Sequence, residues 1–469
     1  MNGNIDVGAS CVPQAGAPTL RSARAVTVAV AAREISALEV AEAALARIAE
    51  VNPLVNAFTT VTAERARRSA EAIDTMRARG LALPTLAGVP YAVKNLFDIA
   101  GLPTVAGSRV LARTPAAASD AVLIQRMDAA GAILVGALNM DEFAYGFTTE
   151  NSHYGATRNP HALTHSAGGS SGGCAAAVAA GMVPLSLGSD TNGSIRVPAS
   201  LCGVYGLKPT FGRLPRQGSY PFVHSLDHLG PFARNASDLA AVYAALLGTD
   251  ATGLTSGKHP VDRPLRVALL GGYFQEFAAS RAREAARAAA AALGVNEEVK
   301  FALARQARAA AYLITAAEGG QLHLAHLRTV YHDMEPLSRD RLAAGAMLPA
   351  HAYIQAQRVR AAARAEAIGL FERFDVLVAP ATPVSAQPLD SDFFEIDGRD
   401  WPTRPNMGLL TQPISCVGLP VATVPWPAPP GALPLGVQLI AAPGREDIAL
   451  GAASLLEQAI GRHSAGGSS

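Results

Sequence analysis

Apolar and polar positions follow two periods along the chain, and each period predicts a different kind of element. Apolar residues that recur every three or four positions are typical of amphipathic helices. The clearest start is the capping box Ser36-Ala-Leu-Glu39, which precedes an amphipathic run to about Ala49. The same pattern predicts further helices over Ala63–Arg79, Asp120–Ala130, Cys174–Ala180, Ala236–Leu247, Arg281–Leu293, Ala304–Tyr331, Ala350–Arg373 and Asp447–Ile460.

Short, continuous apolar runs between these segments predict buried strands. They lie at Tyr91–Val93, Ala132–Val135, Arg266–Leu270, Asp375–Ala379 and Leu435–Ala441. Strands and helices alternate at the spacing of α/β folds. We therefore expect one large α/β domain over 21–463, with a helical insertion over about 270–370. Residues 1–20 are expected to form a flexible arm, and residues 464–469 a frayed tail.

The composition indicates a large buried core and gives no sign of a charged partner. Of the 469 residues, 49% are hydrophobic and only 16% are charged. A formal net charge of +1 provides no global basic field for nucleic acid. The apolar stretch Ala25–Ala32 is too short to span a bilayer. We expect a cytoplasmic protein that binds neither membrane nor nucleic acid directly.

Cysteine and histidine usage argues against a metal site. The four cysteines, Cys11, Cys174, Cys202 and Cys416, are far apart and form no CxxC pair. The eleven histidines form no HExxH or HxH ligand pair. This pattern favours a reducing compartment and predicts neither a disulfide framework, nor a metal, nor another cofactor.

Two segments rich in glycine and serine carry the candidate chemistry. The first is Gly168-Gly-Ser-Ser-Gly-Gly173, and the second is Gly188-Ser-Asp-Thr-Asn-Gly-Ser-Ile-Arg196. Glycine at such positions lets the backbone turn tightly and brings N–H groups close to a ligand. Taken alone, the first segment could be a flexible loop or a phosphate cradle. It is not a Walker loop, because no Lys-Ser/Thr pair follows its glycines.

Lysine usage makes one residue stand out. The chain has only four lysines among 39 basic residues, and Lys94 lies in the apolar context Val89-Pro-Tyr-Ala-Val-Lys94. A buried lysine can lose its proton, whereas arginine cannot. We therefore favour Lys94 as a general base over the alternative, a strand-end lysine held in a salt bridge.

The combination of Lys94 with these two segments resembles the amidase signature family. Further similar segments are Asn139–Ala144, Gly206–Arg213, Ser225–Pro231, Asp375–Pro380 and Pro434–Leu439, so the resemblance covers nearly the whole chain. It implies an α/β fold with a large mixed twisted β-sheet covered on both faces by helices. It also implies a serine amidohydrolase that cleaves an amide bond through an acyl-enzyme.

The resemblance assigns roles to particular residues. Ser194 would be the nucleophile, Ser170 the bridging serine and Lys94 the base. The backbone N–H groups of Thr191, Asn192, Gly193 and Ser194 would form the oxyanion hole.

Four other residues near these motifs have open or structural interpretations. Many relatives have glycine at the position of Asn192. Its side chain either contributes a polar contact or is simply tolerated there, since asparagine accepts positive φ well. Asp190 and Arg196 are expected to form a supporting ion pair. We read Cys174 as core packing.

Finer similarities point to the carboxybiuret hydrolase branch of this family. They lie in Thr191–Ser194, Pro215–Phe222 and Ile314–Gly320. The branch deaminates carboxybiuret in cyanuric acid degradation, and its members can work with a small helical partner subunit. Such a small anionic substrate needs a cation in the pocket.

Arg216 is the first candidate for that cation, with Tyr145 and His224 beside it. His228 is more consistent with packing, and Lys208 with a structural role beside an acid.

Other functions remain open at this point. An aryl or alkyl amidase would share the mechanism but have an apolar pocket. The glutaminase subunit of a tRNA-dependent amidotransferase would share the serine region and act on glutamine. A non-catalytic subunit would not need the intact triad, and a nucleotide-binding protein would need residues that are missing here. We expect a homo-oligomer, such as a dimer, or a hetero-oligomer.

Overall fold

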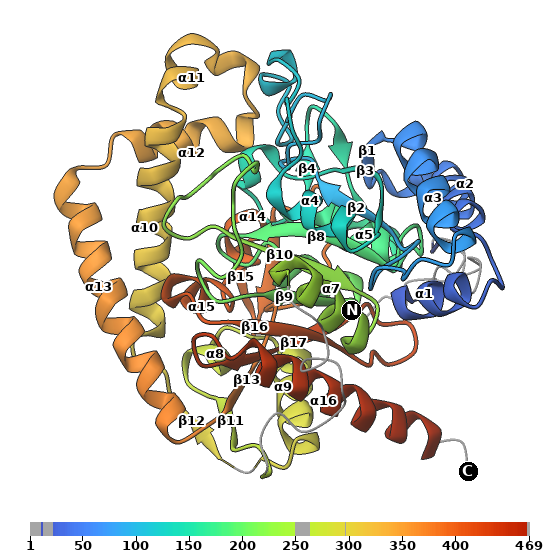
Figure 1. Ribbon diagram of the computed structural model, residues 1–469. Coiled ribbons are helices and arrows are strands. Elements are labelled where there is room, and N and C mark those ends of the chain that lie inside the picture. Colours follow the sequence, from blue (N-terminus) through green and yellow to red (C-terminus); the bar gives the residue numbers. More distant parts are fainter. Residues whose placement is uncertain (1–10, 13–21, 249–262, 296, 467–469) are drawn as a thin grey trace.

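The structure is a computed structural model that describes residues 11–12, 22–248, 263–295 and 297–466 (Figure 1). Within them, eleven strands form one mixed sheet with helices on both faces, as predicted. All but Cys11 and Val12 of the predicted arm lie outside the described residues.

The strands pair in an order that differs from their order in the chain. From one edge to the other they are β1 (Phe58–Val61), β3 (Ile133–Leu138), β2 (Pro90–Lys94), β8 (Leu185–Asp190), β10 (His228–Ala233), β9 (Tyr205–Lys208), β16 (Val421–Trp426), β17 (Leu435–Ala441), β13 (Val376–Pro380), β11 (Val267–Leu270) and β12 (Glu298–Val299). β2 runs parallel to β3 and β8, and β11 runs parallel to β12 and β13. The remaining pairs are antiparallel.

Sixteen α-helices surround the sheet in the described residues. They are α1 (Ala23–Ala31), α2 (Ala37–Val55), α3 (Ala63–Ala78), α4 (Val122–Ala129), α5 (Gly172–Ala179), α6 (Arg196–Cys202), α7 (Ala236–Leu247), α8 (Tyr273–Glu276), α9 (Ser280–Ala292), α10 (Ala304–Leu322), α11 (Leu324–Thr329), α12 (Pro336–Ala346), α13 (Ala350–Gly369), α14 (Thr403–Asn406), α15 (Gln412–Val417) and α16 (Glu446–Gly466).

Smaller elements connect these helices and strands. Three two-stranded sheets pair β4 (Glu150–Asn151) with β5 (Gly155–Ala156), β6 (Arg158–Asn159) with β7 (Ala162–Ser166), and β14 (Phe393–Ile396) with β15 (Arg399–Pro402). Single 3₁₀ turns lie at η2 (Leu111–Arg113), η3 (Glu142–Ala144), η5 (Tyr331–Asp333) and η6 (Leu370–Glu372).

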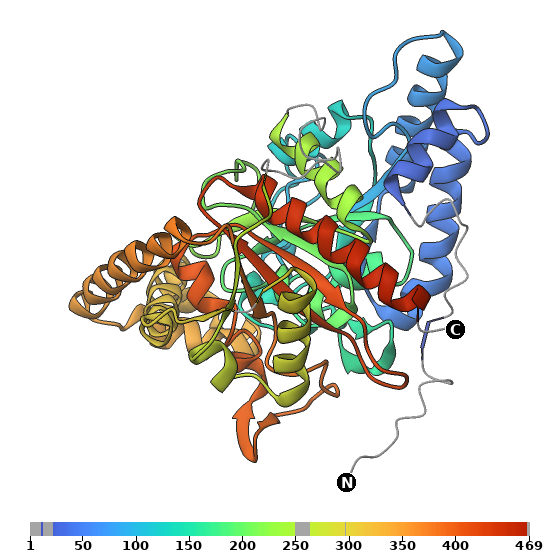
Figure 2. The same ribbon diagram turned by 90° about the horizontal axis from the view of Figure 1, so that it is seen from below.

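The helices form layers and one separate group. Helix α16 lies across the sheet, where it packs on β16 and β17 and beside α7 (Figure 2). Helices α5 and α6 pack on each other and on the central strands. Helices α10 to α13 gather on one side of the molecule, opposite α1 to α3 (Figure 1). The central strands β2, β3 and β8 are buried along their whole length, which explains their continuous apolar sequence.

Several predicted elements agree closely with the structure. Helix α7 and strand β17 have the predicted bounds, and α2 begins with the predicted capping box at Ser36. Helix α16 runs to Gly466, so three residues of the predicted frayed tail are helical and the last three lie outside the described residues. Within the predicted insertion, β12 belongs to the main sheet, and the gathered helices begin only at Ala304.

The helix predicted over Ala304–Tyr331 is divided in the structure, and its first part packs closely on α12. A Cβ atom on Gly320 would lie 2.3 Å from the backbone nitrogen of Ala346, and one on Gly345 would lie 2.0 Å from the Ala316 carbonyl oxygen. Helices α10 and α12 therefore pack backbone to backbone. Helix α10 ends at Leu322, and the chain continues as the short helix α11 and the turn η5.

The sequence pattern missed α1, whose apolar face was interpreted only as too short to cross a bilayer. Ser22 caps this helix, and the Asp238 carboxylate accepts hydrogen bonds from the first residues of α1. Among the described residues, no helix combines the length and apolarity needed to cross a membrane.

Candidate active site

Lys94 ends the fully buried strand β2 and has no exposed surface. Its Nζ donates hydrogen bonds to Ser170 Oγ at 2.6 Å and to Ser189 Oγ at 2.9 Å. Among the described residues both partners are hydroxyls, so the salt bridge of a structural lysine does not form. Burial lowers the pKa of Lys94 to about 8. A neutral amine is therefore accessible close to neutral pH.

Ser170 lies on the glycine-rich loop between β7 and α5. Gly168 has a φ of 77°, and the peptide bond between Gly169 and Ser170 is cis. A Cβ atom on Gly169 would lie 2.2 Å from the carboxylate of Asp141, so a larger residue would displace this loop. Ser171 Oγ donates to the carbonyl oxygen of Ser189 at 3.1 Å, which ties the loop to β8.

Ser194 lies on the tight loop that leads from β8 into α6. Gly193 has a φ of 136°, and a Cβ atom there would lie 2.1 Å from Thr411 Oγ1. Only glycine fits this position without a rearrangement. Ser194 is 2% exposed and lines a pocket, and its Oγ makes no hydrogen bond to another described side chain.

The same loop presents backbone donors. Within the described chain, no group accepts a hydrogen bond from the N–H of Thr191, Asn192, Gly193 or Ser194. Donors left open beside a serine can hold a developing oxyanion.

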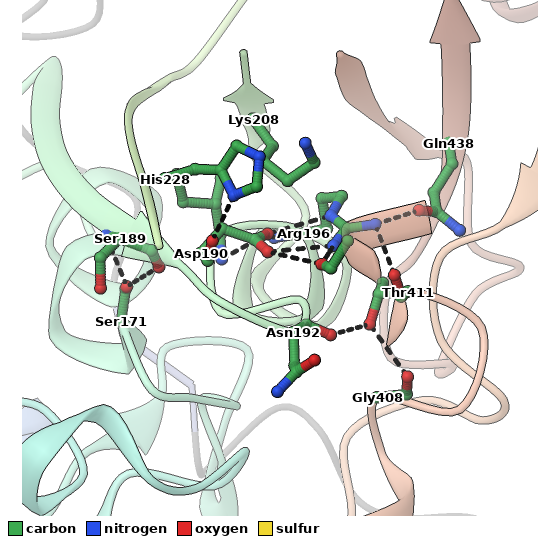
Figure 3. A network of polar contacts seen from close by, with 12 residues as sticks. Ser171, Ser189, Asp190, Asn192, Arg196, Lys208, His228, Gly408, Thr411 and Gln438 are labelled. Carbon is green, nitrogen blue, oxygen red and sulfur yellow. Dashed lines mark hydrogen bonds and ion pairs between the residues drawn. The ribbon is translucent and has the colours of Figure 1, made fainter. Parts of the chain in front are cut away.

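An ion pair buried beneath this loop holds it in place. Arg196 Nε lies 2.9 Å from Asp190 Oδ2, Nη2 lies 3.0 Å from Oδ1, and both side chains are fully buried (Figure 3). Arg196 Nη1 also donates to the Thr411 carbonyl and to Gln438 Oε1. Burial opposes ionisation of Asp190, but the Arg196 guanidinium holds the pKa of that carboxyl well below its usual range. The predicted ion pair is confirmed.

Three residues that were interpreted as structural, His228, Lys208 and Cys174, are buried. His228 Nδ1 lies 3.0 Å from the Asp190 carbonyl oxygen, and burial lowers the pKa of His228 well below its usual value. Lys208 Nζ donates to the Pro209 carbonyl at 3.0 Å and forms no ion pair with a described carboxylate. Burial raises the pKa of Cys174 to about 12, so this residue stays a thiol in the core.

One pocket contains Ser194 and several polar side chains. Tyr145 and Ser194 both line it, and the substrate-binding role of Tyr145 stays a prediction. The other polar side chains at its wall are those of Thr191, Asn192, Tyr312, Thr315, Arg341 and Gln412. The sheet side of the pocket thus supplies the nucleophile, and α10, α12 and α15 supply the facing wall.

Arg216 and His224 do not reach this pocket. Arg216 lines a neighbouring cavity together with Ser189, and its Nη1 donates to the His224 carbonyl at 2.6 Å. The His224 side chain is exposed and lines neither cavity. The loop Pro215–Phe222 turns Arg216 back onto its own backbone, which sequence spacing alone did not indicate.

Arg341 is the pocket cation that the sequence analysis missed. Its guanidinium carbon lies 3.7 Å from the centre of the Tyr145 ring, and no described carboxylate forms an ion pair with it. Its Nε is buried without a hydrogen-bond partner among the described residues. No sequence signal separated Arg341 from the many other arginines, because α12 itself was not predicted. Ser189 was also missed, although it lies within the second motif.

Asn192 does not have a positive φ, so its place in the loop is not explained by the tolerance of asparagine for that conformation. That conformation belongs to Gly193, and Asn192 is not among the residues with positive φ. Its side chain instead lines the pocket.

A buried lysine bonded to one serine, and a second serine with open N–H donors at a pocket, are the groups that a serine hydrolase of the Ser-Ser-Lys type needs. A family model described as Amidase matches residues 39–450. The chain therefore belongs to the amidase family, whose members hydrolyse amide bonds.

Individual relatives and one solved structure agree with this assignment. The chain is 54% identical over 439 residues to AtzE, a 1-carboxybiuret hydrolase subunit of Pseudomonas sp. (strain ADP), in an alignment that covers 91% of this chain and 96% of that protein. It is 37% identical to a glutamyl-tRNA(Gln) amidotransferase subunit of Chloroflexus aurantiacus, with 89% and 92% covered. A solved structure of a vestigial protein complex, tied to the origins of an s-triazine catabolic enzyme, matches with a TM-score of 0.91 and 53% identity. That match covers 93% of this chain and 98% of the solved one.

Proposed function

We propose that this protein is an amidohydrolase that removes ammonia from carboxybiuret or a closely similar small, anionic urea derivative. The observation that carries the proposal is the Arg341 cation in the pocket of Ser194, which forms no ion pair with a described carboxylate. A substrate carboxylate would supply the negative counter-charge for the Arg341 guanidinium. The 54% identity to a 1-carboxybiuret hydrolase subunit supports the same substrate.

In the acylation step, Ser194 Oγ attacks the carbonyl carbon that bears the terminal NH₂ group. Ser170 takes the proton of Ser194 and passes its own proton to the neutral amine of Lys94. The N–H groups of Thr191 to Ser194 hold the resulting oxyanion. The proton then returns from Lys94 through Ser170 to the departing nitrogen, which leaves as ammonia.

Deacylation repeats the relay with water as the nucleophile. Water gives a proton to Ser170 while Ser170 protonates Lys94, and the new oxygen attacks the acyl carbon. Collapse of the tetrahedral intermediate releases Ser194 Oγ, which recovers its proton by the same path. The net reaction consumes one amide and one water, and it yields ammonia and a dicarboxylated urea.

The polarity of the pocket argues against an aryl or alkyl amidase. Asn192 Oδ1 and Arg341 Nε have no partner among the described residues, and an apolar substrate would leave both unpaired. Glutamine is the stronger rival, since its carboxylate could also pair with Arg341. The chain is also 37% identical to a glutamyl-tRNA(Gln) amidotransferase subunit, so glutaminase activity is the second candidate function.

The first experiment is ammonia release by the purified protein from carboxybiuret, biuret, glutamine and an aryl amide. We expect release from carboxybiuret, and a loss of about 10⁴-fold or more in the Ser194→Ala variant, because the nucleophile is gone. Release from glutamine alone would replace the proposed substrate and keep the mechanism. Activity that survives Ser194→Ala would refute the mechanism itself.

The role of Arg341 gives a second prediction. Arg341→Gln should raise KM for carboxybiuret about 10- to 100-fold, because a hydrogen bond to a charged group contributes about 1.5–3 kcal/mol. KM for neutral biuret should change little. Steady-state kinetics on both substrates measure the difference, and a thermal unfolding curve checks that the variant is folded.

Arg216→Gln is the matched control for this prediction. Arg216 lines the neighbouring cavity without reaching Ser194, so its loss should leave both KM values near those of the wild type. A larger effect on carboxybiuret from Arg216→Gln than from Arg341→Gln would show that the substrate extends into the second cavity.

We also propose that the enzyme acts in the cytoplasm and together with a different protein chain. The four cysteines are all free, as is typical of a reducing compartment. The 54% identical relative is itself one subunit of a hydrolase, and the matching solved structure is that of a protein complex; both support a partner.

A further inference from the structure

Asn192 lies two residues before Ser194, on the loop between β8 and α6. It is 7% exposed and lines the pocket of Ser194 and Arg341. Its side chain points away from the ion pair of Asp190 and Arg196 (Figure 3). The side chain of Asn192 thus takes no part in the ion-pair network of Asp190 and Arg196 that supports the loop.

Both the backbone and the amide of Asn192 are held in place. Thr411 Oγ1 donates to the Asn192 carbonyl oxygen at 2.7 Å. The side-chain Nδ2 donates to Thr315 Oγ1 of α10 at 2.8 Å, and Thr315 is 3% exposed. An amide whose nitrogen is held in this way has its oxygen directed elsewhere.

That oxygen lacks a partner. Asn192 Oδ1 is buried and accepts no hydrogen bond from any described residue. Buried carbonyl groups in folded proteins are nearly always paired, and leaving one unpaired is costly. A donor on a bound ligand would remove this cost, and the pocket is the space that such a ligand enters.

We infer that Asn192 Oδ1 accepts a hydrogen bond from the substrate N–H that links the scissile carbonyl to the rest of the molecule. Asn192 is then a specificity-determining residue, and Thr315 is a positioning residue that fixes its amide. The inference rests on the proposed function and narrows its substrate class to ureides, in which nitrogen rather than carbon follows the scissile carbonyl.

Biuret and malonamide test this inference, because they differ only in NH or CH₂ between their two carbonyl groups. Binding is measured by ligand-observed NMR titration of the Ser194→Ala protein, which cannot turn either ligand over. We expect biuret to bind about tenfold more tightly than malonamide, because CH₂ leaves Oδ1 unpaired. In the Asn192→Ala/Ser194→Ala protein the two affinities should become similar.

Two variants of Thr315 provide a matched pair that leaves Asn192 in place. Thr315→Val removes the hydroxyl that accepts the hydrogen bond from Asn192 Nδ2 and should reduce the preference for biuret. Thr315→Ser keeps this hydroxyl and should keep the preference. A purely structural role of Thr315 would not change the ratio of the two affinities. This pair also keeps the test valid if Asn192→Ala fails to fold.

Equal affinity for both ligands, or no binding of either, in the Ser194→Ala protein would overturn the inference. A preference for biuret that persists without Asn192 would overturn it as well. The proposed function can fail separately. Turnover of carboxybiuret without the NH preference removes only this inference, and an Asn192-dependent preference without carboxybiuret turnover removes only the proposed substrate.

Discussion

Replacing Lys94 by methionine should lower kcat/KM for the amide substrate by about four orders of magnitude or more. Methionine has nearly the length of lysine but cannot accept a proton, so Ser194 would lose the base that Ser170 connects to it. The variant should stay folded, because it removes a fully buried amine that burial itself disfavours in its charged form. Ammonia release and a thermal unfolding curve measure the two quantities.

Lys208→Met is the control for this variant. Both lysines are fully buried, but the Lys208 amine donates to the Pro209 carbonyl rather than to a serine hydroxyl. Its loss should change kcat/KM by less than about tenfold, as expected for a residue outside the reacting atoms. A similar loss in both variants would mean that Lys94 acts only through general packing.

The pH profile of the wild type tests the same base independently. Only the neutral amine can take a proton, and the pKa of Lys94 is lowered by burial to about 8. Log kcat/KM should therefore rise with a slope of about one as the pH increases toward 8, and it should level off above that value. Thermal unfolding across the range excludes loss of the fold. A flat profile between about pH 6 and 9 would exclude Lys94 as the titrating base.

The sequence predicted those parts of the fold whose hydrophobic pattern is local. The buried strands β2 and β17 and the helix α7 follow from apolar runs, caps and flanking glycines. The close packing of α10 on α12 depends on contact between Gly320 and Ala346, which lies 26 residues further along the chain. Helical periodicity cannot report such a contact, because glycine weakens a helix only slightly unless a partner approaches it.

The candidate site divides in the same way. Lys94, Ser170 and Ser194 follow from residue chemistry and motif, because only a few residue types can perform these steps. The residues of the facing pocket wall cannot be predicted from residue chemistry and motif. Arg341 and Thr315 come from α12 and α10, and nothing local distinguishes Arg341 from arginines that face solvent. Arg216 seemed a better candidate because it lies near the motif, but its own loop uses the guanidinium.

This division has a functional consequence. The sheet and its loops carry Lys94, Ser170 and Ser194, whereas the helices gathered over Ala304–Gly369 supply pocket-lining groups that, under the proposed function, contact the rest of the substrate. Substitutions on α10 and α12 should therefore change which amide is cleaved, and substitutions on the sheet side should change whether any amide is cleaved.

The largest loss of stability is expected from Arg196→Met. The change removes the only ion-pair partner that Asp190 has among the described residues and leaves a fully buried carboxylate without a counter-charge. Breaking a buried pair by removing one member costs about 3–5 kcal/mol. Urea denaturation measures the free energy of unfolding. Arg445→Met is the control, because Arg445 and its partner Asp447 are 45% and 36% exposed, and such pairs contribute at most about 1 kcal/mol.

The pH dependence of this loss separates charge from packing. In the wild type, Arg196 holds the pKa of Asp190 well below its usual range although burial opposes ionisation, so the stabilising effect is present above the ordinary value of about 3.9. In the variant, burial acts alone and raises that pKa, so the penalty is full at high pH and disappears as the carboxyl takes up a proton. The difference in unfolding free energy should therefore be smaller at about pH 5 than at about pH 8. An equal difference at both values would assign the loss to the hydrogen bonds from Arg196 to Thr411 and Gln438 rather than to the buried charge.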